Sequence, residues 1–198
     1  GSGGGTTPGG NQNNGPGEMP SDSIITYDNL SLSVIKPIID KIKEECFSNE
    51  IFNNISVKFE YHANLGGESS YNRSDKIIKW KNNNDALHGQ IIHELFHAYA
   101  AQACGNKFKA YDVNNEIQAR ILQYAYCRAN SLKLQETPAF IDKFINYYKS
   151  NSLTEYKELV KILKESDSYN VLTEYTATNN NIEEVQSLLK KCEKYNSL

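Results

Sequence analysis

The spacing of hydrophobic residues changes along the chain, and these changes predict an α+β fold. Isoleucines recur every three or four positions within residues 31–47, which indicates a helix with one buried face. Residues 54–63 alternate between apolar and polar side chains, as in a half-buried strand, and residues 76–81 suggest a second short strand. Helical spacing then returns in five segments: 85–104, 115–129, 138–149, 153–166 and 181–195. We therefore expect a short antiparallel or mixed sheet followed by several helices.

The helix expected over residues 85–104 stands out because its apolar residues lie nearly all round it. A helix of that composition is buried, so we expect the sheet to pack against it. Asp85 is the expected N-cap, and Gly105 follows the expected C-terminus. Residues 64–75, rich in Gly, Ser and Asn, are expected to form a loop between the two strands.

The beginning of the chain has a different composition from the rest. Residues 1–22 hold eight of the twelve glycines and three of the five prolines, with almost no apolar side chains. They cannot bury a core, so we expect a flexible linker over 1–22 and one folded domain over 23–198. We expect this linker to tether the domain to an unseen domain or anchor, as in a secreted or cell-surface protein.

The helix expected to be buried carries three polar residues that suit a metal site. His93 and His97 are four positions apart, so both imidazoles project from one face of the helix. Glu94 is rotated from His93 by about 100°, where it can reach a metal-bound water instead of the metal itself. Zinc lowers the pKa of such a water to about 7, and a nearby carboxylate can accept its proton. We interpret the two histidines as metal ligands and Glu94 as the general base.

The third ligand is expected to be a carboxylate. His62 and His88 both precede the motif, and no histidine follows it. Asp112 and Glu116 are the downstream carboxylates that compete for the position. Asp112 lies in a connecting segment, whereas Glu116 lies at the start of a predicted helix, which holds a ligand more rigidly. We therefore expect Glu116 to complete the ligand set and a fourth position to stay open for water.

The motif His93-Glu94-x-x-His97, followed by 18 residues and Glu116, resembles the gluzincin class of zinc metallopeptidases. The resemblance covers residues 55–130, and in size the chain is similar to minimal single-domain members of the class. It implies a zincin-like fold and one Zn²⁺ per chain. It also implies a peptide or protein substrate, cleaved with a zinc-bound water and Glu94 as general base.

The surroundings of the motif match this class in part. Residues 70–80 look like the edge strand that lines the cleft of such enzymes and binds the substrate backbone. Many gluzincins place an aspartate four residues after the glutamate ligand to orient a histidine, but this chain has Arg120 there, so another acceptor must serve. The class stabilises the oxyanion with a tyrosine or histidine, for which Tyr111 and Tyr175 are candidates and neither is assigned.

Charge and hydropathy narrow the range of partners. The formal net charge of −3 lacks the basic excess of a nucleic-acid binder, and no run of 18 apolar residues predicts a membrane span.

The alternatives to a metallopeptidase are a catalytically silent zincin-fold binding module, a zinc hydrolase acting on a non-peptide bond, and a toxin-like effector domain of a larger secreted protein. The presence of Glu94 argues against the silent module, because a binding module needs no base.

The four cysteines, Cys46, Cys104, Cys127 and Cys192, are far apart and form no Cys-x-x-Cys pair, which argues against a cysteine zinc site. Two disulfides and four free thiols are the competing interpretations. A domain of this size does not need disulfides for stability, so we expect buried free thiols.

Overall fold

The computed structural model describes residues 24–105, 107–108, 112–166 and 181–198. Within these residues the fold is α+β, with seven α-helices and a small mixed sheet of four strands. The strands are β1 (Ile25–Tyr27), β2 (Val57–Tyr61), β3 (Ser69–Asn72) and β4 (Ile77–Trp80). The helices are α1 (Asn29–Ile42), α2 (Ser48–Phe52), α3 (Leu87–Ala103), α4 (Val113–Ala129), α5 (Pro138–Ser150), α6 (Leu153–Glu165) and α7 (Glu183–Leu189), followed by the 3₁₀ helix η1 (Glu193–Ser197). The expected linker over residues 1–22 lies outside the described residues.

The sheet has the strand order β1-β2-β4-β3, in which β3 is antiparallel to β4 and the other pairs are parallel. The prediction of a short antiparallel or mixed sheet is therefore confirmed as a mixed sheet. Strands β2 and β4 fall where the sequence pattern placed them. Strand β3 lies inside the segment 64–75, which we expected to be a loop. The sequence did not predict this strand because Ser-Ser-Tyr-Asn has no alternation of apolar and polar residues.

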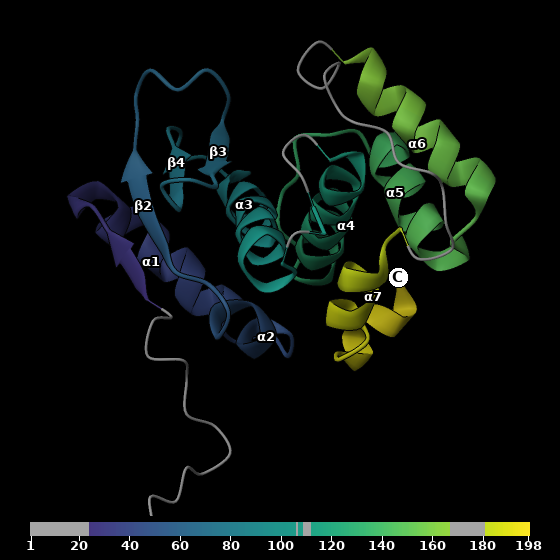
Figure 1. Ribbon diagram of the computed structural model, residues 1–198, viewed down its shortest axis with the longest axis horizontal. Helices are drawn as coiled ribbons and strands as arrows, with labels where there is room; N and C mark the ends of the chain where they lie inside the picture. The colour runs from purple at the N-terminus through teal and green to yellow at the C-terminus, as the bar shows by residue number, and fades with distance from the viewer. Residues whose placement is uncertain (1–23, 106, 109–111, 167–180) are drawn as a thin grey trace, which may run out of the picture.

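One face of the sheet carries the buried side chains, while the other face is more polar. Val57 and Phe59 of β2, with Ile78 and Trp80 of β4, are buried on the inner face. Helix α1 packs against β1 and β2, and helix α3 packs against β3. The Trp80 Nε1 donates a hydrogen bond of 2.8 Å to the Ser31 Oγ, which ties the sheet to α1. In Figure 1 the sheet lies at one end of the molecule and α5 and α6 at the other, with α3 and α4 between them.

Helix α3 is buried, as its composition predicted, but it begins differently from the prediction. Its N-cap is Ala86 and not Asp85, and the Asn84 side chain accepts a hydrogen bond of 3.0 Å from the Ala86 N–H. The helix ends just before Gly105, whose φ of +63° is the left-handed conformation that favours glycine. The predicted end of the helix is therefore correct.

Helices α3 and α4 pack closely and run antiparallel. His93 of α3 contacts Gln123 in the second half of α4, and His97, one turn later, contacts Asn115 near its start. Gly89 permits this approach, because a Cβ at that position would meet the Cys127 Sγ at 3.0 Å. The two helices on which we expected the metal ligands are thus direct neighbours in the core.

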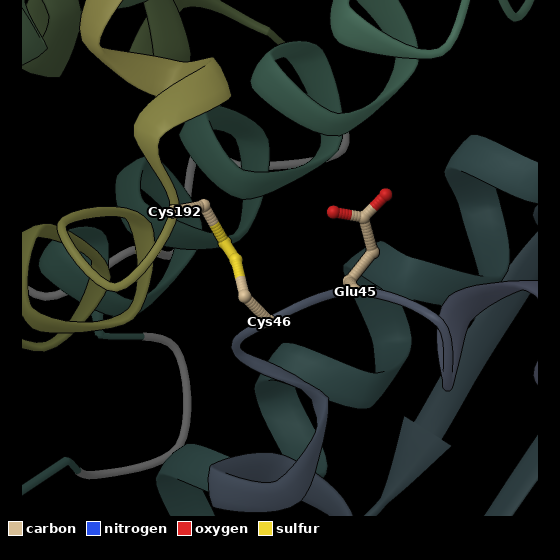
Figure 2. Close-up of side chains that lie close together, drawn as sticks. All are labelled: Glu45, Cys46 and Cys192. Carbon is tan, nitrogen blue, oxygen red and sulfur yellow. A yellow bond between two sulfur atoms is a disulfide. The ribbon is translucent and has the colours of Figure 1, made fainter.

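A disulfide links the end of the chain to the turn that follows α1. Cys46 in this turn and Cys192 after α7 form a disulfide, with their Cα atoms 5.6 Å apart (Figure 2). The buried Glu45 lies beside this bond and accepts a hydrogen bond of 2.8 Å from the Tyr195 hydroxyl. A covalent bond and a buried polar contact therefore hold the same two segments together.

The expectation of free thiols is wrong for Cys46 and Cys192. These cysteines are 146 positions apart, so their pairing depends on how the whole chain folds and not on a local pattern. Cys104 and Cys127 are free thiols, of which only Cys127 is buried. No helix among the described residues is both long and apolar enough to cross a membrane, in keeping with the expectation of no membrane span.

Candidate metal centre

Helices α3 and α4 bring the three predicted metal ligands together. His93 and His97 lie on one face of α3, and Glu116 lies in the first turn of α4. Their donor atoms all lie within 4.8 Å of one another; His93 and Glu116 are buried and His97 is partly buried. The protein therefore contains a His–His–Glu group that could hold a metal ion.

The spacing of the donor atoms fits one small ion. The Nε2 atoms of His93 and His97 are 3.0 Å apart, and the Glu116 oxygens lie 3.5 Å from the first and 3.2 Å from the second. Ligand atoms at about 2.0–2.1 Å from a tetrahedral zinc ion are separated from one another by roughly 3.3 Å. The three observed separations lie around this value, so the group needs little rearrangement to bind zinc.

The hydrogen bonds of the two imidazoles indicate which ring nitrogens face the centre. The Nδ1 of His93 lies 3.0 Å from the Gln123 Oε1, and the Nδ1 of His97 lies 3.1 Å from the Asn115 Oδ1. An amide oxygen only accepts, so each Nδ1 is the donor in its contact, and each Nε2 is left to face the other imidazole and the Glu116 carboxylate. In a neutral ring this Nε2 offers a lone pair to a metal ion, and without a metal ion a proton must lie between these close atoms. The donor set therefore fits a metal ion, and Gln123 and Asn115 are acceptors that the sequence analysis left unnamed.

Arg120 supports the carboxylate of Glu116 and does not orient a histidine. Its Nε donates a hydrogen bond of 2.9 Å to the Glu116 Oε1, and a second nitrogen donates to the Tyr124 hydroxyl at 2.9 Å. Its guanidinium also lies over the Phe144 ring, 5.9 Å from the ring centre. Amide side chains therefore orient the two histidines, and Arg120 holds the Glu116 carboxylate.

The electrostatic surroundings of Glu116 and His97 favour the ionised form of the Glu116 carboxylate. Burial alone would raise the pKa of the Glu116 carboxyl, but the charge of His93, hydrogen bonds from both imidazoles and the charge of Arg120 hold this pKa well below its usual range. Burial opposes the charged form of His97, yet hydrogen bonding to Glu116 and the nearby negative charges raise its pKa. Glu116 is therefore ionised at neutral pH, and the group attracts positive charge.

Asp112, the competing carboxylate, has a structural position. It is the N-cap of α4, and its Oδ1 accepts hydrogen bonds from the backbone N–H groups of Asn114 at 2.8 Å and Asn115 at 3.3 Å. It does not belong to the group of donors formed by the two histidines and Glu116. The preference for Glu116 over Asp112 thus agrees with the geometry of the described residues.

Glu94 lies beside the donor group and borders an open cleft. Its side chain is buried to 6 % exposure, and its Oε1 accepts a hydrogen bond of 2.9 Å from the Ser69 Oγ of β3. A cleft of about 310 Å³ reaches His93 and Glu94, with walls from β3, α3, α4 and residues 134–136. A molecule in this cleft would contact His93, one of the three predicted ligands, and Glu94, the expected base.

Tyr111 and Tyr175, the candidates for oxyanion stabilisation, lie outside the described residues. His62 directly follows β2, and its Nε2 is 3.0 Å from the Glu60 carboxylate and not at the centre. Sequence reasoning also missed Gln123, although it is seven positions after Glu116 and thus two helical turns along the same face of α4. Ser69 gave no such signal, because it lies in a segment that was expected to be a loop.

A second cluster of donors does not form a metal site. Glu45, Cys46 and Cys192 lie close together, but the two sulfur atoms are bonded to each other (Figure 2). The Glu45 carboxylate already accepts hydrogen bonds from Tyr195 and from Asn130. The group on α3 and α4 is therefore the better metal centre among the described residues.

Comparisons with known proteins leave this centre to be judged by its own geometry. No family model matches the chain, and no curated protein or solved structure does so either. The features that bear on function are therefore the His–His–Glu group, Glu94 beside it and the cleft lined by His93 and Glu94.

Proposed function

We propose that the protein is a zinc-dependent metallopeptidase with a zincin-like fold. The observation that carries this proposal is the convergence of His93, His97 and Glu116 on one point, with Glu94 next to them at the end of a cleft. Three protein ligands and an open fourth position are typical of catalytic zinc, whereas structural zinc usually has four protein ligands. The resemblance of the motif to gluzincins supports the same function.

The residues of the centre have separate roles in this proposal. His93, His97 and Glu116 hold the ion, and Gln123 and Asn115 fix the orientation of the imidazoles. A bound zinc ion would polarise the scissile carbonyl and make water more acidic. Glu94 takes the proton of the attacking water and passes it to the leaving amine nitrogen as the C–N bond breaks. The buried surroundings strengthen these charge interactions by excluding bulk water.

The cleft supports a peptide or protein as the substrate. Strand β3 is the last strand of the sheet, and residues 67–69 at its start line the cleft beside Glu94. An extended peptide can pair with the edge of a sheet through backbone hydrogen bonds, which would lay its chain along the cleft. The resemblance implies an edge strand over residues 70–80, but only residues 70–72 of this range belong to the edge strand β3, because Ile77–Trp80 form the inner strand β4.

The disulfide between Cys46 and Cys192 bears on where the protein works. Disulfides persist in oxidising environments and are rare in the reducing cytosol. We therefore propose that the protein works outside the cytosol, as a secreted or cell-surface protein.

The direct test of this function is cleavage of a diverse peptide pool, with products identified by mass spectrometry. We expect the zinc-loaded protein to cleave peptides, and we expect Glu94→Gln to slow cleavage by about 10²–10⁴-fold, the usual contribution of a general base. Because the amide has nearly the same shape, the variant should keep its zinc and its melting temperature. Equal cleavage by the variant would remove Glu94 from the mechanism, and no cleavage by the native protein would favour the silent binding module.

A further inference from the structure

Ser69 of β3 contacts the expected base Glu94, and the function proposed above gives Ser69 no role. Its Oγ donates a hydrogen bond of 2.9 Å to the Oε1 of Glu94, across 25 positions of sequence and between two different elements. Among the described residues it is the one hydrogen-bond donor to this carboxylate. A buried carboxylate with a single donor is oriented by that donor, because a hydrogen bond to a charged group is stronger than one between neutral groups.

The position of Ser69 is itself fixed by the sheet. In the antiparallel pair of β3 and β4, Ser69 lies opposite Trp80. The Trp80 ring is buried, and its Nε1 bonds to the Ser31 Oγ of α1. The sheet register therefore sets the place from which the Ser69 hydroxyl reaches α3.

We propose that Ser69 is a positioning residue that holds Glu94 in the orientation needed for proton transfer, an inference that rests on the proposed peptidase function. By occupying Oε1, Ser69 leaves Oε2 as the oxygen that accepts the proton of the attacking water. The water oxygen forms the new bond to the carbonyl carbon, the proton goes to Oε2, and the same proton later moves to the amine nitrogen as the C–N bond breaks. Within the described part of the chain, Oε2 has no hydrogen-bond donor of its own.

The role of Ser69 predicts a specific kinetic pattern. Ser69→Ala should lower kcat about tenfold, a part of the ~10²–10⁴-fold that a general base supplies, because the carboxylate is still present but less well oriented. KM and zinc content should stay unchanged, since the Ser69 side chain is not proposed to bind substrate or metal. Ser69→Thr keeps the hydroxyl and should restore most of the rate. In a Glu94→Ala background, Ser69→Ala should have no further effect.

A serine on another element supplies a matched control. Ser33 lies on α1, where its Oγ donates a hydrogen bond of 2.9 Å to the Leu30 carbonyl, and Ser33→Ala should leave kcat unchanged. Thermal unfolding tests the contact without any catalysis. Each single variant removes the same hydrogen bond between Ser69 and Glu94. The loss of melting temperature in the Ser69→Ala/Glu94→Ala double variant should therefore be smaller than the sum of the two single losses.

The outcomes separate this inference from the proposed function. If the native protein is active and Ser69→Ala lowers kcat as much in the Glu94→Ala background as in the native one, Ser69 does not act through Glu94. Additive losses of melting temperature would show that the two side chains are not in contact, which also overturns the inference. A native protein that cleaves no peptide refutes the peptidase function, and the role of Ser69 in it is then refuted as well.

Discussion

At the scale of single residues, the composition of the metal site depends on which carboxylate completes it. Glu116 lies with the two histidines, whereas Asp112 caps the helix that carries Glu116. The sequence supported this choice only through helix rigidity and the spacing of a family motif. The structure adds a physical reason, since the Asp112 carboxylate is already used by backbone N–H groups at the start of α4.

These positions predict opposite effects for two substitutions. Glu116→Ala should weaken zinc binding by at least about 100-fold, because removing even a partner of a ligand commonly costs 10–100-fold. Asp112→Ala removes a helix cap and should cost about 1 kcal/mol of stability with little change in zinc affinity. Competition with a fluorescent zinc chelator measures the affinity, and chemical unfolding measures the stability. A titration in which only Asp112→Ala weakens binding would reverse the assignment.

The residues that the sequence did not reveal are those that act across elements. His93, Glu94 and His97 could be recognised because their spacing on one helix already sets their relation. Ser69 and Asn115 reach the site only through the fold, by hydrogen bonds to Glu94 and His97. No local pattern marks a serine or an asparagine as the partner of a side chain on another element.

At the scale of elements, helices α3 to α6 and strands β2 and β4 were predictable, whereas strands β1 and β3 were not. Helices α3 to α6 each span at least 13 residues, long enough for helical spacing to show, so the sequence located them within about two residues. Strands β1 and β3 have three and four residues, and tertiary pairing rather than sequence pattern makes them strands. The edge of the cleft therefore lies where the sequence was least informative.

The close packing of α3 on α4 makes a prediction at this scale. Gly89→Ala gains about 1 kcal/mol of helix propensity, but its Cβ would lie 3.0 Å from the Cys127 Sγ and 3.2 Å from the Gln123 Nε2. Because Gln123 orients His93, we expect a lower zinc affinity and a net loss of stability from overpacking, of about 1–2 kcal/mol. Gly66→Ala, where a Cβ meets nothing within 4 Å, is the control that should change neither. Tighter zinc binding in Gly89→Ala would contradict this view of the interface.

At the scale of the whole molecule, the disulfide links the turn after α1 to the end of the chain. A bond across 146 positions restricts the unfolded chain strongly, and removing such a native disulfide typically costs about 2–5 kcal/mol. Cys46→Ser with Cys192→Ser should lower the free energy of unfolding by this amount in urea, while zinc stoichiometry stays the same because the metal centre lies on α3 and α4. Cys104→Ser, at a free and partly buried thiol, is the matched control. An unchanged unfolding midpoint in the double variant would show that the bond adds no stability.

The central claim is that one zinc ion binds between His93, His97 and Glu116. The most direct test is a crystal structure of the zinc-loaded protein with anomalous data collected on both sides of the zinc absorption edge. The account predicts one anomalous peak per chain, within about 2.0–2.2 Å of the Nε2 atoms of both histidines and a carboxylate oxygen of Glu116. A peak at another place, or no peak at this group in protein that contains stoichiometric zinc, would contradict the account.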